Sequence, residues 1–196
     1  MLTRARCGMS LVELLVGLGI AAFLMMAGVP AFVTWLQNAQ NRTAGELIMN
    51  GIQLARLEAV KRNAVVRFDL TDETGRIAWN VGCITVTDEC PATIQSRPAD
   101  EAAANARAGV SKTVLPTSIP PGYFSSPISA GTELAAGVSF NGLGRVVNEG
   151  TDIARVDITN LASADARRFV VMVSSGGLVR MCDPALSLAK NPQGCS

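Results

Sequence analysis

The chain lacks histidine, and it has few aromatic side chains: one tyrosine, two tryptophans and six phenylalanines among 196 residues. Without imidazole, histidine-dependent catalytic triads, histidine-containing metal sites and acid–base catalysis by imidazole are excluded. The sequence has no Walker-type phosphate loop, and no GxGxxG motif opens a helix. We therefore expect no enzymatic activity, no cofactor and no metal site.

Charged residues are also scarce, at 17% of the chain, and the formal net charge is +1. A balance of this kind gives no global field that would attract nucleic acid. Apolar residues make up 48% of the sequence, which allows one globular core in addition to an anchor.

A long apolar run occupies residues 9–33 and is broken only by Ser10, Glu13, three glycines and Pro30. About 25 residues are enough for a helix to span a bilayer core of about 30 Å. Arg4 and Arg6 precede the run and should remain cytoplasmic. The run would then cross the inner membrane once, and the domain that follows it would lie in the periplasm. No small-residue cleavage site follows Val33, so the run does not resemble an ordinary secretory signal.

Glu13 is the unusual residue of this run. An ionisable group inside an apolar segment is costly unless it is paired, and it commonly marks a functional position. A simpler interpretation is a capping box, in which Ser10 and Glu13 satisfy the first amides of the helix. The residues by themselves leave both interpretations open.

The segment CGMSLVELLV, residues 7–16, resembles the prepilin signal of type IV pilins and type II secretion pseudopilins. The resemblance implies that a prepilin peptidase cuts after Gly8 and that Met9 becomes the methylated N-terminus. Met9 stands where phenylalanine is usual. The resemblance also implies that Glu13 meets the terminal amine of a neighbouring subunit. An ammonium and a carboxylate buried together would fix the axial register between subunits.

Pro30 lies late in the apolar run. It removes one backbone hydrogen bond and should kink the helix, with Gly28 adding local freedom. An ordinary membrane-helix proline is an equal alternative.

The chain divides into four expected parts: a leader at residues 1–8, a membrane and filament-core helix at 9–33, its amphipathic continuation at 34–62, and a β-rich globular domain at 63–196. In the continuation, apolar residues recur at helical spacing: Ala44, Leu47, Ile48, Ile52, Ala55 and Ala59. Strand-like patterns cover residues 64–70, 76–87, 138–140 with 145–147, 153–159, 167–174 and 178–182. Residues 88–136 read mostly as a variable surface insertion that could include a short helix. The expected fold class is α+β, with one long N-terminal helix packed on a mainly antiparallel sheet.

Four of the five cysteines follow the apolar run, which suggests two disulfides in an oxidising compartment. The spacing favours Cys83 with Cys90 and Cys182 with Cys195, since each pair closes a short loop rich in turn residues. Three pairings are formally possible, and free buried thiols are the alternative.

The second half of the chain resembles the GspH/FimT branch of the pilin family. The supporting segments are RFD at 67–69, FNGLGR at 140–145 and VSSGGLVRMC at 173–182. The resemblance implies a minor pilin or pseudopilin in the tip or initiation complex of a type IV pilus, or in a secretion pseudopilus. Its expected partners are other pilins, the prepilin peptidase and the inner membrane.

A second function, DNA binding during DNA uptake, follows from the same resemblance. Some FimT-like minor pilins use a Gly-Arg-x-Arg turn to bind DNA, and the matching positions here read GLVR, residues 177–180. The first arginine of that motif is missing, which leaves Arg180, aided by Arg145, Arg167 and Arg168. Without the two leader arginines, fifteen basic side chains face sixteen acidic ones, which disfavours sequence-independent DNA binding.

Overall fold

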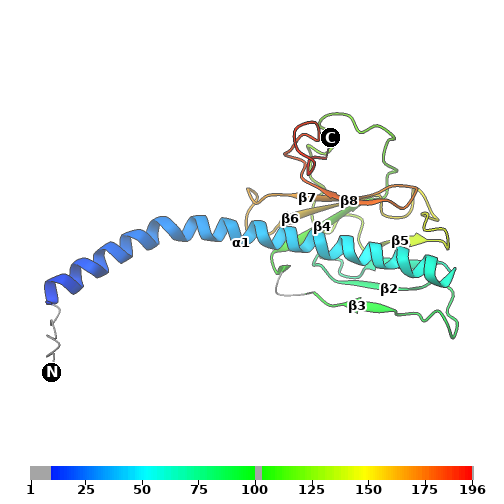
Figure 1. Cartoon of the computed structure of the whole chain (residues 1–196), viewed down its shortest axis with the longest axis horizontal. Helices are drawn as coiled ribbons and strands as arrows, with labels where there is room; N and C mark the ends of the chain where they lie inside the picture. Colours follow the sequence, from blue (N-terminus) through cyan, green and yellow to red (C-terminus); the bar gives the residue numbers. More distant parts are fainter. Residues whose placement is uncertain (1–9, 100–102, 196) are drawn as a thin grey trace, which may run out of the picture. The chain divides into compact units, whose positions relative to one another are not determined.

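The computed structural model describes residues 10–99 and 103–195. The expected leader and its cleavage site, Gly8 and Met9, lie outside these residues. Among the described residues, one α-helix, α1, runs from Leu11 to Arg62, and eight strands follow it (Figure 1). The chain separates into two compact units, residues 1–36 and 37–196, and the boundary falls within α1.

In the first unit, α1 is an exposed apolar helix. The helix continues through Pro30 without a break. The hydroxyl of Thr34 donates a hydrogen bond to the carbonyl oxygen of Pro30 at 3.1 Å, the i−4 bond that serine and threonine commonly make in helices.

In the second unit, α1 buries one face at the spacing that the sequence predicts. Five of its apolar side chains are fully buried: Ala44, Ile48, Ile52, Ala55 and Ala59. Gly51 lies on this face, where a Cβ atom would come within 2.6 Å of the Phe68 ring and 3.1 Å of the Trp79 indole. A glycine is therefore required for the helix to approach the aromatic residues of β1 and β2 so closely.

The globular unit contains two four-stranded antiparallel sheets. The first has the order β3-β2-β1-β5, and its strands are Gln95–Arg97, Trp79–Cys83, Val66–Leu70 and Ala136–Phe140. The second has the order β4-β6-β7-β8, with strands Ala106–Ser111, Arg155–Asn160, Phe169–Val173 and Val179–Cys182. Core residues of both sheets and of α1 form one apolar cluster. The structure thus has the helix-on-antiparallel-sheet fold that the sequence predicts.

The predicted insertion at 88–136 is wrong in part, because two strands lie within it. Strand β4 pairs with β6 along its whole length, from Ala106 opposite Asn160 to Ser111 opposite Arg155. Its apolar side chains are small, and Ala106, Ala108 and Val110 are almost fully buried. An alanine-rich sequence has low strand propensity, so the partner strand rather than local preference determines this element.

Another difference concerns residues 145–147, which were expected to extend a strand. They form only an isolated bridge, between Phe140 and Val146. They return alongside β5 and shield its outer edge, since the amide of Val147 donates to the carbonyl of Ser139 at 3.0 Å.

Candidate assembly site

The N-terminal turn of α1 shows half of a capping box. The backbone amide of Glu13 donates to the Ser10 hydroxyl at 3.2 Å. Within residues 10–99 and 103–195, the Glu13 carboxylate has no cationic partner, and the backbone amide of Ser10 does not donate to it. The cap accounts for Ser10, but it gives the carboxylate of Glu13 no partner.

The side chains that follow Glu13 are apolar and exposed. The exposed fraction of the large hydrophobic side chains in this part of α1 lies between 42%, at Val33, and 81%, at Met26. Of the helices in the described part of the chain, α1 is long and apolar enough to cross a membrane. Exposed apolar surface on this scale needs a lipid or protein environment.

Three asparagine side chains join α1 to the second sheet at the start of the globular unit. Asn41 is fully buried, and its amide donates to the carbonyl of Arg167 at 2.9 Å. Asn160 donates to the Asn41 oxygen at 3.1 Å, and the Arg167 amide donates to Asn38 at 2.7 Å. Because these bonds connect residues more than 100 positions apart, sequence patterns gave no signal for them.

The two glycine-containing segments of the family resemblance meet against α1. The Arg56 Nε atom donates to the carbonyl oxygen of Gly144 at 3.1 Å. The amide of Val146 donates to the carbonyl oxygen of Ser175 at 3.2 Å. Gly177 closes the β7–β8 turn with a φ of +81°, which favours glycine. We call this meeting point of the 141–145 loop, the 174–178 turn and Arg56 the glycine junction.

The four arginines predicted to bind DNA have different surroundings. Arg167 pairs with Asp183, and Arg168 pairs with the buried Asp157. Arg180 donates to the carbonyl oxygens of Pro192 and Gly194. Arg145 is exposed, and its guanidinium has no partner among residues 10–99 and 103–195. The structure therefore does not bring the four together as one free basic surface.

Arg168 instead belongs to a buried ionic network that sequence reasoning missed. The fully buried Asp157 accepts from Arg155 at 2.6 Å and from the Ile128 amide at 3.0 Å, in addition to its contact with Arg168. Arg155 also donates to the Ser126 carbonyl at 2.8 Å. The network therefore holds residues 124–128 against the second sheet.

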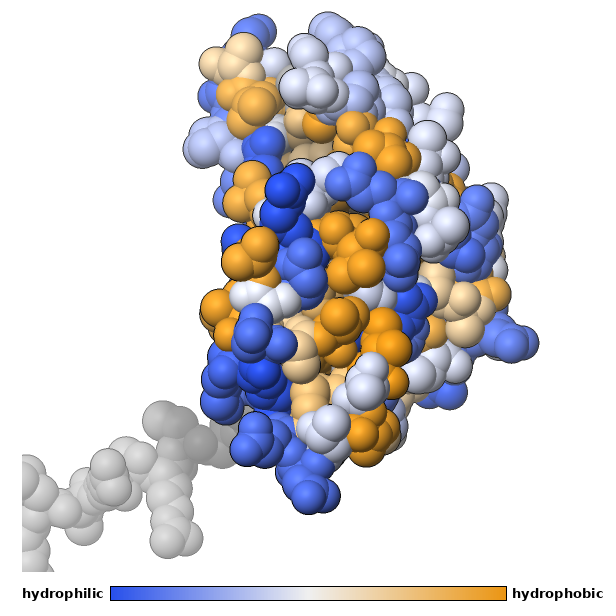
Figure 2. Space-filling model, turned by 90° about the vertical axis from the view of Figure 1, so that its right-hand side faces the viewer, coloured by the Kyte–Doolittle hydropathy of each residue, from blue (hydrophilic) through white to orange (hydrophobic). Residues whose placement is uncertain are grey.

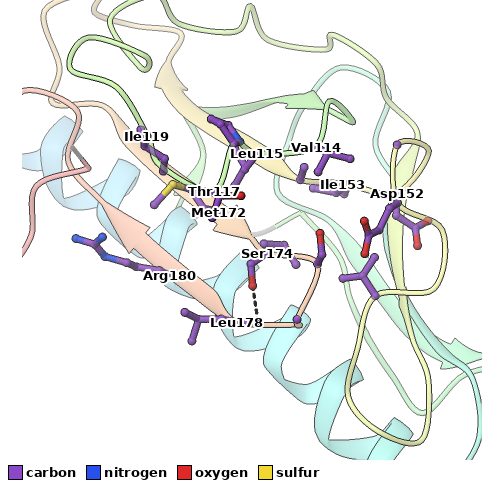
Figure 3. A pocket seen from close by; sticks show the side chains of 18 residues that line it. Val114, Leu115, Thr117, Ile119, Asp152, Ile153, Met172, Ser174, Leu178 and Arg180 are labelled. Atoms are coloured by element: carbon purple, nitrogen blue, oxygen red, sulfur yellow. Dashed lines mark hydrogen bonds between the residues drawn. The ribbon is translucent and has the colours of Figure 1, made fainter.

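A cleft of about 430 Å³ lies on the second sheet, between the 114–119 segment and the β7–β8 turn (Figure 3). Ile153 and Met172 contribute apolar surface, while Leu178 and Arg180 lie at one rim. The buried Asp152 also lines the cleft. Its oxygens already accept from Arg67 at 2.9 Å and from the Ser139 amide at 2.9 Å. The carboxylate is therefore part of a structural ion pair.

At the end of α1, Glu58 forms ion pairs with Arg62 at 2.7 Å and with Lys61 at 3.1 Å. Burial raises the pKa of the Glu58 carboxyl, but the hydrogen bonds from Arg62 and Lys61 outweigh it. The net result is a pKa below the ordinary value, so the carboxylate is ionised near neutral pH. Arg62 also contacts the carbonyl of Glu89, which links the helix end to the 83–90 loop.

The structure joins the two cysteine pairs that the spacing favours. The Cα atoms of Cys83 and Cys90 are 5.7 Å apart, and those of Cys182 and Cys195 are 5.0 Å apart. Each disulfide closes a local loop: the two cysteines are 7 positions apart in the first pair and 13 positions apart in the second. Among the described residues, no group of three or more cysteine, aspartate or glutamate side chains could hold a metal ion.

Comparison with solved structures gives similarities at low identity. The type IV minor pilin FimU of Pseudomonas aeruginosa is 19% identical, over 79% of this chain and 94% of FimU, with a TM-score of 0.48. The minor pseudopilin EpsH from the type 2 secretion system of Vibrio cholerae is 11% identical, over 75% of this chain and 99% of EpsH, with a TM-score of 0.47. A search of curated proteins gave no match.

The family assignment rests on the sequence model of the family described as type II transport protein GspH, which matches residues 44–177. The match begins in the buried half of α1 and ends at Gly177 of the β7–β8 turn, so it includes the 141–145 loop and residues 174–177 of the turn. Since it covers more than half of the sequence, the chain belongs to the GspH family and is a type IV pilin-like protein of the GspH/FimT group.

Proposed function

We propose that this protein is a minor pilin or pseudopilin, a structural subunit of a type IV pilus or a type II secretion pseudopilus that acts in the tip or initiation complex. The observation that carries the proposal is Glu13: a carboxylate with no cation among the described residues, on a helix that exposes apolar side chains. An N-terminal ammonium from a neighbouring subunit would supply the missing charge.

The proposal includes processing and location. The prepilin peptidase cleaves after Gly8, Met9 becomes the mature N-terminus, and the inner membrane holds α1 before assembly while the globular unit lies in the periplasm. Other pilins bind along α1, and Pro30 contributes to its fit among them. Packing among the helices then replaces lipid as the environment of the apolar side chains.

Intact-mass and N-terminal analysis tests this proposal. The full chain is isolated from membranes of cells with and without the prepilin peptidase. We expect a mature chain that begins at Met9 only when the peptidase is present. A chain that still begins at Met1, or begins at any other residue, would contradict the proposal. Glu13→Gln tests the register step: we expect a cleaved protein that no longer enters filaments.

DNA binding for uptake is the second candidate. Arg145 and Arg180 favour it, because neither contacts a carboxylate within the described residues. Arg167 and Arg168 do not, since both are in ion pairs with aspartates. Titration of the full chain with duplex DNA at several salt concentrations tests the candidate. Arg180→Ala should lower both the affinity and its salt slope, whereas Arg76→Ala, a change at an exposed position in the loop before β2, should not. An unchanged slope in Arg180→Ala excludes this role.

A further inference from the structure

The glycine junction is surrounded by exposed apolar side chains. Leu143 is in the loop beside Gly144, and Leu178 follows Gly177; they are 81% and 66% exposed. Leu57 and Val60, one turn apart on the same side of α1, are 66% and 51% exposed. Val60 lies beside the junction, because its Cγ2 atom would be 3.2 Å from a Cβ on Gly144.

These four side chains with Arg145 are named the junction surface. Figure 2 shows the end of the globular unit at which α1 finishes, where apolar and polar side chains are interspersed. Single exposed leucines are ordinary on a protein surface. Four of them around one contact between two turns are a cluster rather than a scatter of single residues, and clustered exposed apolar side chains can mark interaction sites.

Three arginines lie at or near the junction, and Glu149 lines the cleft beside Leu178 and Arg180. Arg56 donates to the Gly144 carbonyl and Arg180 to the carbonyls of Pro192 and Gly194, so neither charge is neutralised by these contacts. Arg145 has no partner among the residues that the structure describes. By contrast, Arg67 and Arg155 are each in direct contact with aspartates. The junction thus combines apolar surface with cations that have no carboxylate among their described contacts.

We propose that the junction surface docks the globular part of a neighbouring pilin-like subunit, which covers the leucines with apolar side chains and places a carboxylate opposite Arg145. The inference rests on the proposed function and identifies a contact outside the N-terminal helix. A desolvated apolar centre with a polar rim is typical of protein interfaces. Nucleic-acid surfaces are more polar and more strongly basic, so the leucines favour a protein partner.

Site-specific photo-crosslinking in cells that assemble the filament tests the contact. A photoreactive amino acid replaces Leu143 in the full chain, and a matched control replaces Leu161, which is 69% exposed and lies between β6 and β7. Sheared filaments are then isolated, and the crosslinked peptides are sequenced. We expect position 143 to crosslink to the globular part of a protein that carries a prepilin signal, and position 161 to give little of that product.

Three further variants separate docking from folding. Arg145→Glu should lower the yield at position 143 while leaving the thermal unfolding of the chain unchanged, because Arg145 is exposed. Leu178→Asp should lower the crosslinking yield at position 143 about tenfold, since docking would bury an unpaired carboxylate. Arg145→Lys keeps the charge and should retain most of the product.

The outcomes are distinguishable. If the unsubstituted chain is absent from the filament fraction, the proposed function fails and this inference fails with it. If the chain is present but position 143 gives no pilin-like product, or gives no more than position 161, the inference alone is overturned. Crosslinks from position 143 to DNA would likewise overturn it in favour of the nucleic-acid role.

Discussion

The carbonyl oxygen of Gly144 occupies the space in which a side chain on Gly177 would lie: an ideal Cβ on Gly177 comes within 2.0 Å of that oxygen. The two glycines are on separate turns, and Arg56 of α1 donates to the same oxygen at 3.1 Å. The glycine in the C-terminal motif is therefore required by a tertiary contact as well as by its turn.

We predict that Gly177→Ala destabilises the protein strongly. The alanine would have a φ of +81° and would contact backbone, which cannot move as a flexible side chain does. We expect a loss of at least ~2 kcal/mol in the free energy of unfolding. Chemical denaturation of the full chain in detergent measures it. Gly176→Ala is the matched control, because its nearest non-neighbouring atom would be 3.9 Å away. Equal losses in both variants would contradict the junction geometry.

Asp157→Asn should destabilise the second sheet and release the segment that the ionic network holds. Removing one partner of a buried ionic network typically costs ~3–5 kcal/mol. We expect lower stability together with faster proteolysis near residues 124–128. Asp165→Asn, an exposed change in the β6–β7 loop, should have neither effect. A protease-resistant Asp157→Asn variant would show that the segment is held by other contacts.

Stability should fall in acid partly through Glu58. The pKa of the Glu58 carboxyl is lower in the folded protein than in the unfolded chain. Its contribution to the free energy of unfolding is therefore complete above the unfolded pKa of about 4.3 and is lost as the pH falls through the lower folded pKa. In Glu58→Gln this part of the pH dependence should disappear, and stability near neutral pH should decrease. Unfolding free energies between about pH 3 and pH 6 measure the difference. Glu149→Gln, at an exposed position, should follow the unsubstituted chain; if Glu58→Gln does so too, the ion pairs contribute nothing.

The two disulfides should be recovered as local pairs. Peptide mapping without reduction is expected to give Cys83 joined to Cys90 and Cys182 joined to Cys195. A Cys83–Cys195 link would contradict both the spacing argument and the structure. Replacing Cys182 and Cys195 by serine together should lower the free energy of unfolding by ~2–4 kcal/mol, because the closed loop restricts the unfolded chain.

The outcome for the strands shows what sequence patterns can specify. Strands β1, β6 and β7 were predicted because β-branched and aromatic residues favour strands by their local chemistry. Strand β4 was missed, because Ala106, Arg107 and Ala108 carry little strand preference of their own. Its place is determined by the unpaired edge of β6, which is distant in sequence.

The basic residues show the same limit. Sequence reasoning grouped Arg145, Arg167, Arg168 and Arg180 by resemblance and charge, but charge alone does not reveal a partner. Asp157 and Asp183 take two of them into ion pairs, and carbonyl oxygens hold a third. Only Arg145 of the four has no partner within residues 10–99 and 103–195.

The sequence by itself determined the features that depend on neighbouring residues: the apolar helix with Glu13 in it, the amphipathic spacing that buries Ala44 to Ala59, and the short cysteine loops. These follow from helical periodicity and local chain closure. The tertiary structure alone decided the Asn41 contact, the Asp157 network and the glycine junction. Each of these brings together groups separated by tens of residues or more, and their hydrogen bonds exist only after the core has fixed the sheets against α1.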